Sequence, residues 1–376
     1  MGATTFRLVG LFAALYVGDA TADELAEQSS RLARLLGSEA DSNFSRALEP
    51  REFSFPEDHG PHPGFRNEWW YLTGNLNDDA DRRFGFELTI FRFALAPTVP
   101  SSTSAWRTNQ VYMAHLAVTD AESNRFYVAQ RYSRAAVGLA GAQDAPFRVW
   151  IDNWEIAAQP DTTDWRLHAG ESDIDIDLQL TALKPPVLNG VDGLSQKSAD
   201  PQNASYYYSI TRLQTKGRMR IGARAFNVSG LSWLDREWST SALAANQVGW
   251  DWFALQLNDG SELMLYELRL DDGSRDPASA GTYVAANGAA SHLTASDVEI
   301  SVLDEWASPD GGTYPSRWLL RIPRFDLELT VTPVISDQEL FTIVRYWEGA
   351  VDVSGTQGVQ QVDGRGYVEL TGYADN

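Results

Sequence analysis

From Phe53 onward the chain consists of short stretches in which apolar and polar residues alternate, or in which apolar residues run on at strand length. The clearest are FGFELTIFRFAL (84–95), VYMAHLAVTD (111–120) and DIDIDLQLTAL (173–183), each bounded by turn residues. The segments NLNDDADRRFGF and QLNDGSELMLY place Asn-Asp clusters between strands, as hairpins do. Because no convincing amphipathic helix separates the strands, a parallel α/β fold is disfavoured. The pattern predicts an all-β chain of antiparallel strands.

Part of this pattern occurs twice. WWYLTGNLND and WDWFALQLND align without gaps, which places Trp69 on Trp250. NWEIA is echoed by YWEGA, and FNVSG loosely by YVELTG, in the same order in both halves. Such ordered self-similarity indicates two related domains. We expect two consecutive antiparallel β-barrel domains, at 53–240 and 241–376, because many short strands of this kind close into sandwiches or barrels.

The first 22 residues resemble an export signal. Arg7 precedes the apolar run LVGLFAALYVG, and ATA fits a small-residue cleavage site. The apolar run is too short to span a bilayer, so we expect no stable membrane insertion. An ordinary N-terminal helix is the alternative. Residues 23–52 are expected to form a linker, with a polar helix from Glu24 to Leu48. A periplasmic or secreted protein follows.

Composition excludes several classes of function. The chain has no cysteine, which excludes a disulfide framework, thiol catalysis and a lipoprotein anchor. Its formal net charge of −21 argues against nucleic acid as a partner, since phosphate binding needs a basic surface. Thirteen Trp, fourteen Tyr and sixteen Phe instead favour an aromatic-rich interior or an aromatic-lined cavity.

Successive side chains of the segment GFRNEWWYLTG must point to opposite faces of a strand. Trp69 and Tyr71 therefore share one face, and Glu68 and Trp70 share the other. Because Trp69 has a repeat partner in Trp250, we expect it to pack within its own barrel. Glu68 and Trp70 are the better site candidates.

The segment GLSWLDREWS carries the strongest chemical signal. If it is extended, Trp233, Asp235 and Glu237 lie on one face. Two carboxylates beside a Trp can be driven apart in pKa, so that one stays protonated as a general acid. The alternative is a salt-bridge network with Arg236 or Arg66 at a barrel mouth. The segment lies where the first domain passes to the second, and clefts between domains favour ligand sites.

Three histidines could take part in a site. His59 and His62 belong to the loop FPEDHGPHP, and His115 lies on a predicted strand. Two or three of them could bind zinc, although the HGPH loop lacks the helical spacing of metalloproteases. A hydrogen-bonded loop that covers a cleft is the simpler interpretation. For His115, a hydrogen-bonded core residue is the default.

A long polar connection, residues 189–213, runs into the three consecutive tyrosines 206–208. Long loops in compact domains are commonly lids or binding loops. The sequence contains neither a G-x-S-x-G nucleophile elbow nor a phosphate-binding glycine loop.

These segments together resemble a known family. FPEDHGPHPGFRNEWWYLTGNL, ASYYYSITRL and SWLDREWS…VGWDWFALQLNDGSELMLYELR are similar to the AttH-like secreted proteins related to carotenoid 1,2-hydratase. The resemblance runs from about Phe53 to the C-terminus. It implies a pair of lipocalin-like β-barrels, and activity on apolar, often isoprenoid or polyketide-derived molecules without a metal or organic cofactor. In the hydratases an Asp, preceded two residues earlier by a Tyr, donates a proton to a C=C bond. Asp235 matches that Asp, and Trp233 stands in place of the Tyr.

The leading hypothesis is therefore a cofactor-free hydratase or hydrolase that binds an apolar small molecule between its barrels. A buried, protonated Asp235 would act as the acid, and Glu237 or His59 would position water. Aromatic faces would stabilise the developing cation. We expect Glu68 and Trp70 to share a cavity with His59 or His62 close to Asp235, and Arg66 to pair with Glu68 or Asp235.

Two alternatives stay open at this point. The first is a lipocalin-type carrier that uses the same aromatic residues only to bury its ligand. The second is a zinc hydrolase that uses the three histidines. The full set of expected ligand-binding residues is His62, Arg66, Glu68, Trp70, Tyr71, His115, Tyr207, Trp233, Arg236 and Trp238.

Overall fold

The computed structural model describes residues 43–374 except 242 and 343. The predicted signal peptide (1–22) and residues 23–42 of the predicted linker lie outside the described residues. Within the described part the chain forms β-strands and three one-turn 3₁₀ helices, without an α-helix: η1 (Glu57–His59), η2 (Ala295–Asp297) and η3 (Pro323–Phe325). The all-β prediction is confirmed.

The strands of the described residues form two antiparallel sheets. The first sheet takes β1 to β13 and runs in the order β4-β3-β2-β1-β13-β12-β9-β8-β7-β6-β5, with β10 and β11 also paired to β12. Its strands are β1 (Asn67–Asp78), β2 (Arg83–Ala94), β3 (Gln110–Asp120), β4 (Arg125–Arg134), β5 (Ala140–Asp144), β6 (Phe147–Ile151), β7 (Trp154–Ala158), β8 (Trp165–Glu171), β9 (Ile174–Ala182), β10 (Val187–Leu188), β11 (Leu194–Gln196), β12 (Ala204–Ile221) and β13 (Arg224–Ser239).

The second sheet takes β14 to β23 in the order β17-β16-β15-β14-β23-β22-β20-β19-β18, with β21 paired to β22. Its strands are β14 (Gln247–Leu257), β15 (Glu262–Leu270), β16 (Ala280–Val284), β17 (Ala290–Thr294), β18 (Glu299–Ala307), β19 (Thr313–Ile322), β20 (Leu327–Pro333), β21 (Glu339–Phe341), β22 (Arg345–Gln357) and β23 (Gln360–Thr371). The three strands expected from alternation at 84–95, 111–120 and 173–183 correspond to β2, β3 and β9.

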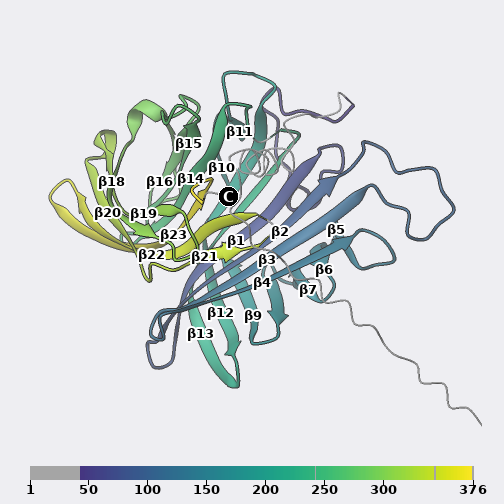
Figure 1. The fold of residues 1–376 in the computed structure, drawn as a ribbon, viewed down its shortest axis with the longest axis horizontal. Coiled ribbons are helices and arrows are strands. Elements are labelled where there is room, and N and C mark those ends of the chain that lie inside the picture. The colour runs from purple at the N-terminus through teal and green to yellow at the C-terminus, as the bar shows by residue number, and fades with distance from the viewer. Residues whose placement is uncertain (1–42, 242, 343, 375–376) are drawn as a thin grey trace, which may run out of the picture.

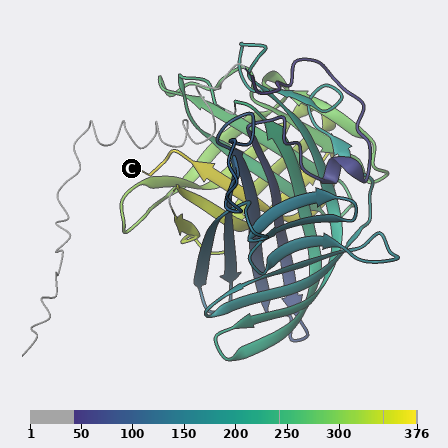
Figure 2. The ribbon, with the colours of Figure 1, turned by 90° about the vertical axis from the view of Figure 1, so that its right-hand side faces the viewer.

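Each sheet curls into a nearly closed barrel or a half-barrel, in agreement with the expected pair of lipocalin-like barrels. In the first, β3 and β4 at one edge return to contact β5 and β6 at the other. The green and yellow strands of the second sheet lie beside the purple to teal strands of the first (Figure 1). Seen from the side, the first barrel stands in front of the second (Figure 2). The predicted domain limits at residues 240 and 241 stay a prediction, and the change of sheet falls between Ser239 and Gln247.

The strand order supports two of the three sequence echoes, since FNVSG and YVELTG also lie on corresponding strands, β13 and β23. In both sheets the first strand lies between its hairpin partner and the last strand, so β1 corresponds to β14 and β13 to β23. Trp69 and Trp250 therefore occupy equivalent strands. The echo of NWEIA by YWEGA is wrong as a structural equivalence, because it joins β7 with β22, strands with different places in their sheets.

Apolar side chains gather in three layers rather than two. One core fills the first barrel and includes Trp70, Leu72 and Trp238, and another fills the second barrel. A third lies between the barrels and includes Tyr71 and Trp252, whose rings meet edge to face with centroids 4.9 Å apart. Alternate side chains of β1 therefore pack into two different cores.

The end of the predicted linker packs on the first barrel. Residues 43–48 are not helical, contrary to the expectation of a helix reaching Leu48. Phe44 and Ala47 are buried, the backbone N–H of Ser45 donates to the Gly64 carbonyl, and the Ser45 carbonyl accepts a bond from the Thr240 hydroxyl. Among the described residues, no helix has the length and apolarity needed to cross a membrane.

The barrels approach closely at Gly85, which has no side chain to keep them apart. A Cβ on Gly85 would lie 2.6 Å from Oη of Tyr367 and 2.7 Å from Cβ of Ala350, both on the second barrel. We predict that Gly85→Val lowers the free energy of unfolding by about 1–3 kcal/mol, because the added methyl groups must separate the barrels. Urea unfolding measures the effect. Ala225→Val, at an exposed position of β13, is the control, and equal stability of the two variants would contradict the close packing.

Candidate functional site

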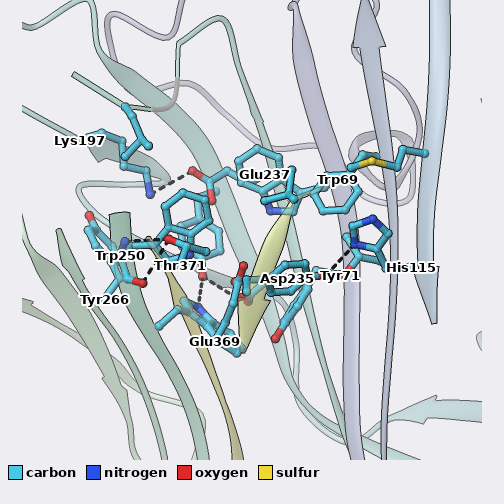
Figure 3. Close-up of a pocket in the computed structure, with 18 of the residues that line it drawn as sticks. Trp69, Tyr71, His115, Lys197, Asp235, Glu237, Trp250, Tyr266, Glu369 and Thr371 are labelled. Carbon is cyan, nitrogen blue, oxygen red and sulfur yellow. Dashed lines mark hydrogen bonds and ion pairs between the residues drawn. The ribbon is translucent and has the colours of Figure 1, made fainter. Parts of the chain in front are cut away.

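A pocket opens between the two barrels, where β1, β2 and β13 face β14, β15 and β23 (Figure 3). The space not filled by protein atoms is about 1030 Å³, its open mouth included. Most of the lining side chains are aromatic or aliphatic, and three carboxyl groups, one lysine and one histidine stand among them. The lining residues are Trp69, Tyr71, Thr89, Phe91, Phe93, Met113, His115, Lys197, Tyr207, Asp235, Glu237, Leu243, Trp250, Trp252, Tyr266, Leu268, Val344, Tyr346, Glu369 and Thr371.

Asp235 lies in the middle of β13 and is held by three hydrogen-bond donors. Its Oδ1 accepts bonds from the Trp233 indole N–H (2.7 Å) and from the Ser209 hydroxyl, and its Oδ2 accepts one from the Tyr207 hydroxyl (2.5 Å). Tyr207 in turn accepts a bond from Trp252 of the second barrel at 3.1 Å. Register explains the arrangement, because Ser209 on β12 is the cross-strand partner of Asp235.

The donors do not fully compensate for the loss of water around Asp235. Burial raises its pKa from 3.8 to about 6, the three hydrogen bonds oppose the rise, and the negative charge of Glu237 adds to it. A carboxyl group with a pKa near neutrality can both give and take a proton at physiological pH.

Glu237, two residues further along the same face, is paired with Lys197. The ammonium group lies 3.0 Å from Glu237 Oε1 and above the rings of Tyr207 and Tyr266. Burial would lower the pKa of Lys197, but Glu237 and Tyr266 raise it overall, so the ion pair is retained. Lys197 comes from the long connection that was expected to be a binding loop.

The third carboxyl group belongs to the second barrel. Glu369 lies on β23, opposite Trp252 on β14. Burial raises its pKa to about 7; a hydrogen bond from the Trp250 side chain opposes the rise, and Asp235 and Glu237 add to it. Figure 3 shows Asp235, Glu237 and Glu369 near one another, with His115 further along the pocket.

At the other end of the pocket, polar contacts join the two barrels. His115 Nδ1 lies 2.6 Å from the Tyr346 hydroxyl, and Tyr71 donates to Glu348 Oε1 at 2.6 Å. Burial lowers the pKa of His115 to about 3, which keeps its imidazole neutral. Burial also raises the pKa of Glu87 and Glu348 well above the ordinary value.

Glu68 belongs to a different environment, inside the first barrel. Its carboxylate pairs with Arg92 and Arg236, and it accepts bonds from the backbone N–H of His62 at 3.0 and 3.2 Å. Burial alone would raise the pKa of Glu68, but the two guanidinium groups hold it well below its ordinary value. Arg236 also lies over the Trp70 ring, 3.9 Å from its centroid. This cluster fastens the HGPH loop to the barrel.

The two loop histidines contribute to that interior. His59 Nδ1 lies 2.6 Å from the Tyr208 hydroxyl, and burial, followed by the charge of Arg236, lowers its pKa to about 4. His62 stacks on Trp238 with ring centroids 3.7 Å apart. His115 faces the pocket instead, so the three-histidine zinc site that was left open as an alternative does not form. No group of three or more His, Asp or Glu side chains in the described part of the chain is placed to hold a metal ion.

Of the residues expected at the site, the structure places five on the pocket wall and one directly behind it. Tyr71, His115, Tyr207, Asp235 and Glu237 line the pocket, and Trp233 holds Asp235 from behind. The others do not line it: His59, His62, Arg66, Glu68, Trp70, Arg236 and Trp238. The expectation that Glu68 and Trp70 lie close to Asp235 is wrong, since they face the interior of the first barrel.

The roles expected for Trp69, packing within its barrel, and for Trp70, binding the ligand, are likewise wrong, because the structure shows the reverse. Trp70 is fully buried in the first barrel and donates its N–H to the His59 carbonyl at 2.8 Å. Trp69 is half-buried and lines the pocket, as does Trp250. Arg66, expected to pair with Glu68 or Asp235, does not make the ion pairs of Glu68, which go to Arg92 and Arg236.

Sequence reasoning missed Lys197 and the pocket residues of the second barrel. The signal was present in the repeat: Trp69 and Trp250 match because both barrels use the same strand face against each other. In β23 the alternation of Tyr367, Glu369 and Thr371 with apolar residues marks a face with polar groups.

Comparisons with known proteins agree on the family. Residues 46–373 match the model of the AttH-like family. The crystal structure of a Nitrosomonas europaea protein named as a candidate AttH is 33% identical, with a TM-score of 0.79, and the match covers 88% of this chain and 100% of that one. Kievitone hydratase from Nectria haematococca shares the fold, with 16% identity, a TM-score of 0.65 and coverage of 91% and 99%. No curated protein sequence matches the chain.

Replacement of the two neighbouring tryptophans should have different effects on the stability of the protein and on ligand binding. We predict that Trp70→Ala lowers the free energy of unfolding by about 3–5 kcal/mol, because it empties a fully buried site. Trp69→Ala should cost less stability and weaken binding of the neutral apolar dye N-phenyl-1-naphthylamine about tenfold, because it removes a pocket wall. Urea unfolding and dye fluorescence measure the two effects.

The matched control is Trp150→Ala. Trp150 is also half-buried, but it lies on β6 and donates to Gly138 away from the pocket. Its replacement should leave dye affinity unchanged. Dye binding that survives Trp69→Ala but is lost in folded Trp70→Ala protein would contradict the assignment of faces.

Proposed function

This chain belongs to the AttH-like family, and from the chemistry of its pocket we propose that it is a hydratase-like enzyme. It would add water to a C=C bond of an apolar small molecule, or remove water to form one. The reaction would take place between the barrels, at the carboxyl groups of Asp235, Glu237 and Glu369.

The observation that carries the proposal is the state of Asp235. It is a buried carboxyl group on the wall of an aromatic pocket, with a pKa of about 6. Hydrogen bonds from Trp233, Ser209 and Tyr207 fix its orientation. A fold that only enclosed an apolar ligand would gain nothing from desolvating three carboxyl groups, since each costs several kcal/mol to bury.

The aromatic walls of the pocket can stabilise the positive charge that develops on the substrate during hydration. Protonation of an alkene leaves a positive charge on carbon, and the π-faces of Trp69, Trp250 and Trp252 line the same space. Ionised carboxylates nearby add to the stabilisation in a site with little water. Glu237, held by Lys197, would orient the water molecule, a role that we expected for it or for His59.

The substrate class follows from the lining. Aromatic and aliphatic side chains dominate it, and polar groups concentrate around Asp235, which suits an apolar molecule with one reactive unsaturated position. Kievitone hydratase, which shares the fold, is named for a hydration reaction. Since the carboxyl groups of the chain can both give and take protons, the proposed reaction needs no cofactor.

A lipocalin-type carrier is the second candidate. The apolar lining would favour retention of an unmodified ligand. Mass spectrometry of the small molecules that co-purify with the protein separates the two. One unmodified ligand would favour the carrier, whereas a pair of compounds differing by one water would favour the enzyme.

The proposal includes a location in the periplasm or outside the cell. It rests on the sequence of residues 1–22, which resembles an export signal. N-terminal sequencing of the protein recovered from its host should find a mature chain that begins near Asp23. An N-terminus at Met1 in a cytoplasmic fraction would contradict export.

Replacement of Asp235 tests the proposed chemistry. Kievitone and geranylgeraniol serve as unsaturated apolar probes, incubated with the protein in oxygen-18 water. The expected product is heavier by one labelled water. Asp235→Asn should lower turnover about 100-fold or more, because the amide can neither give nor take the proton, while dye binding in the pocket is retained.

The control for that variant is Asp251→Asn. Asp251 is equally buried, and burial also raises its pKa to about 6, but it pairs with Arg269 and Tyr373 and does not line the pocket. Turnover per folded molecule should remain unchanged in this variant. Wild-type turnover by Asp235→Asn would remove Asp235 from the mechanism.

A further inference from the structure

We propose that Glu369 of the second barrel is the proton donor of the pocket, and that Asp235 of the first barrel works opposite it as the carboxylate base. The proposal rests on the proposed hydratase function and deepens it. The acid is then a residue that sequence reasoning did not single out, and Asp235, which we expected to be the acid, becomes the base.

Asp235 and Glu369 occupy equivalent positions in the two barrels. Tyr71 on β1 pairs with Asp235 on β13, and Trp252 on β14 pairs with Glu369 on β23. Because the aligned repeat places Tyr71 on Trp252, Glu369 is the counterpart of Asp235 in the second barrel. Equivalent faces of the two barrels meet at the pocket, so each contributes one carboxyl group at the same register.

The two carboxyl groups differ in the hydrogen bonds that they accept. Asp235 receives three donors on its two oxygens, an arrangement that stabilises the ionised form. For Glu369 the donor is the side chain of Trp250. Two carboxyl groups in unequal environments divide into acid and base, and the group with fewer donors keeps its proton.

Carboxyl groups of both barrels surround Glu369. Glu348, its directly opposite neighbour on β22, is itself a buried carboxyl group whose pKa burial raises well above the ordinary value, so it offers no positive charge to Glu369. Asp235 and Glu237 face it from the first barrel, and Glu87 lies near Glu348. Among the described residues Glu369 has no Lys, Arg or His partner, and Lys197 is engaged by Glu237. Burial in these surroundings raises the pKa of Glu369 to about 7.

Hydration of the alkene would proceed by one proton donation and one proton uptake. The carboxylic O–H of Glu369 breaks, and its proton forms a C–H bond at one alkene carbon, which leaves a carboxylate and a carbocation. The oxygen of a water molecule bonds to the other carbon, and one water proton passes to the Asp235 carboxylate. The product is the alcohol, and proton exchange with solvent returns Glu369 to the acid and Asp235 to the carboxylate.

A titration without substrate tests the protonation state directly. Glutamate carboxyl carbons labelled with carbon-13 are followed by NMR as the pH is varied. The wild-type protein should show a signal that changes near pH 7 and is absent from Glu369→Gln, while Asp251→Asn retains it. A Glu369 that is already ionised at pH 5 would overturn the proposal.

The second test is the pH dependence of kcat/KM, measured with whichever of the two probes the protein hydrates. Activity should rise as Asp235 loses its proton near pH 6, and fall as Glu369 loses its proton near pH 7. Glu369→Gln should lower turnover about 100-fold or more and remove the alkaline limb. Asp235→Asn should remove the acidic limb from any residual activity.

The two tests separate the failure of this inference from the failure of the proposed function. Wild-type turnover by Glu369→Gln, or loss of the alkaline limb in Asp235→Asn instead, would overturn the assignment of Glu369 while hydration stands. A wild-type protein that hydrates neither probe would count against the hydratase function, and the NMR titration would still decide whether Glu369 holds a proton.

Discussion

The two barrels pack against each other through strand faces that point outward from each barrel, and the candidate site depends on this contact. Tyr71 and Trp233 on the first barrel would be exposed aromatic residues if the second barrel were absent. Trp252 and Tyr367 cover them from the second barrel in one shared apolar layer. Burial of this layer stabilises the contact, and the same burial removes water from Asp235 and Glu369.

The interior of the first barrel holds the opposite face of the same strands in place. Glu68 on β1 joins Arg92 on β2 and Arg236 on β13 in a fully buried ion cluster. Removal of one member would leave uncompensated charge, at a cost of about 3–5 kcal/mol. The cluster therefore fixes the register of the central strands, and β13 presents Asp235 outward because Arg236 is held inward.

A near-symmetric frame yields a site that is chemically asymmetric. β1 and β13 supply Tyr71 and Asp235, while β14 and β23 supply Trp252 and Glu369 at equivalent register. The loop before β12 adds Lys197 to one side only, where it pairs with Glu237. The place corresponding to Glu237 in the second barrel is close to Thr371, which bonds to the Trp250 backbone. These differences provide unequal surroundings for two otherwise similar carboxyl groups.

The sequence by itself determined the all-β class, the two barrels and the place of Asp235 and Glu237 on one face of a strand. Alternation along strands and an aligned repeat are local properties, and they can be recognised in one chain. The same alternation sorted Trp69 and Tyr71 from Glu68 and Trp70, but it did not tell which face is inside a barrel. Only the tertiary structure decided that. Both faces of β1 are apolar enough to be buried, because one packs inside the first barrel and the other against the second. Lys197 and Glu369 reach Asp235 from distant parts of the chain, and such meetings are set by barrel packing rather than by any local pattern.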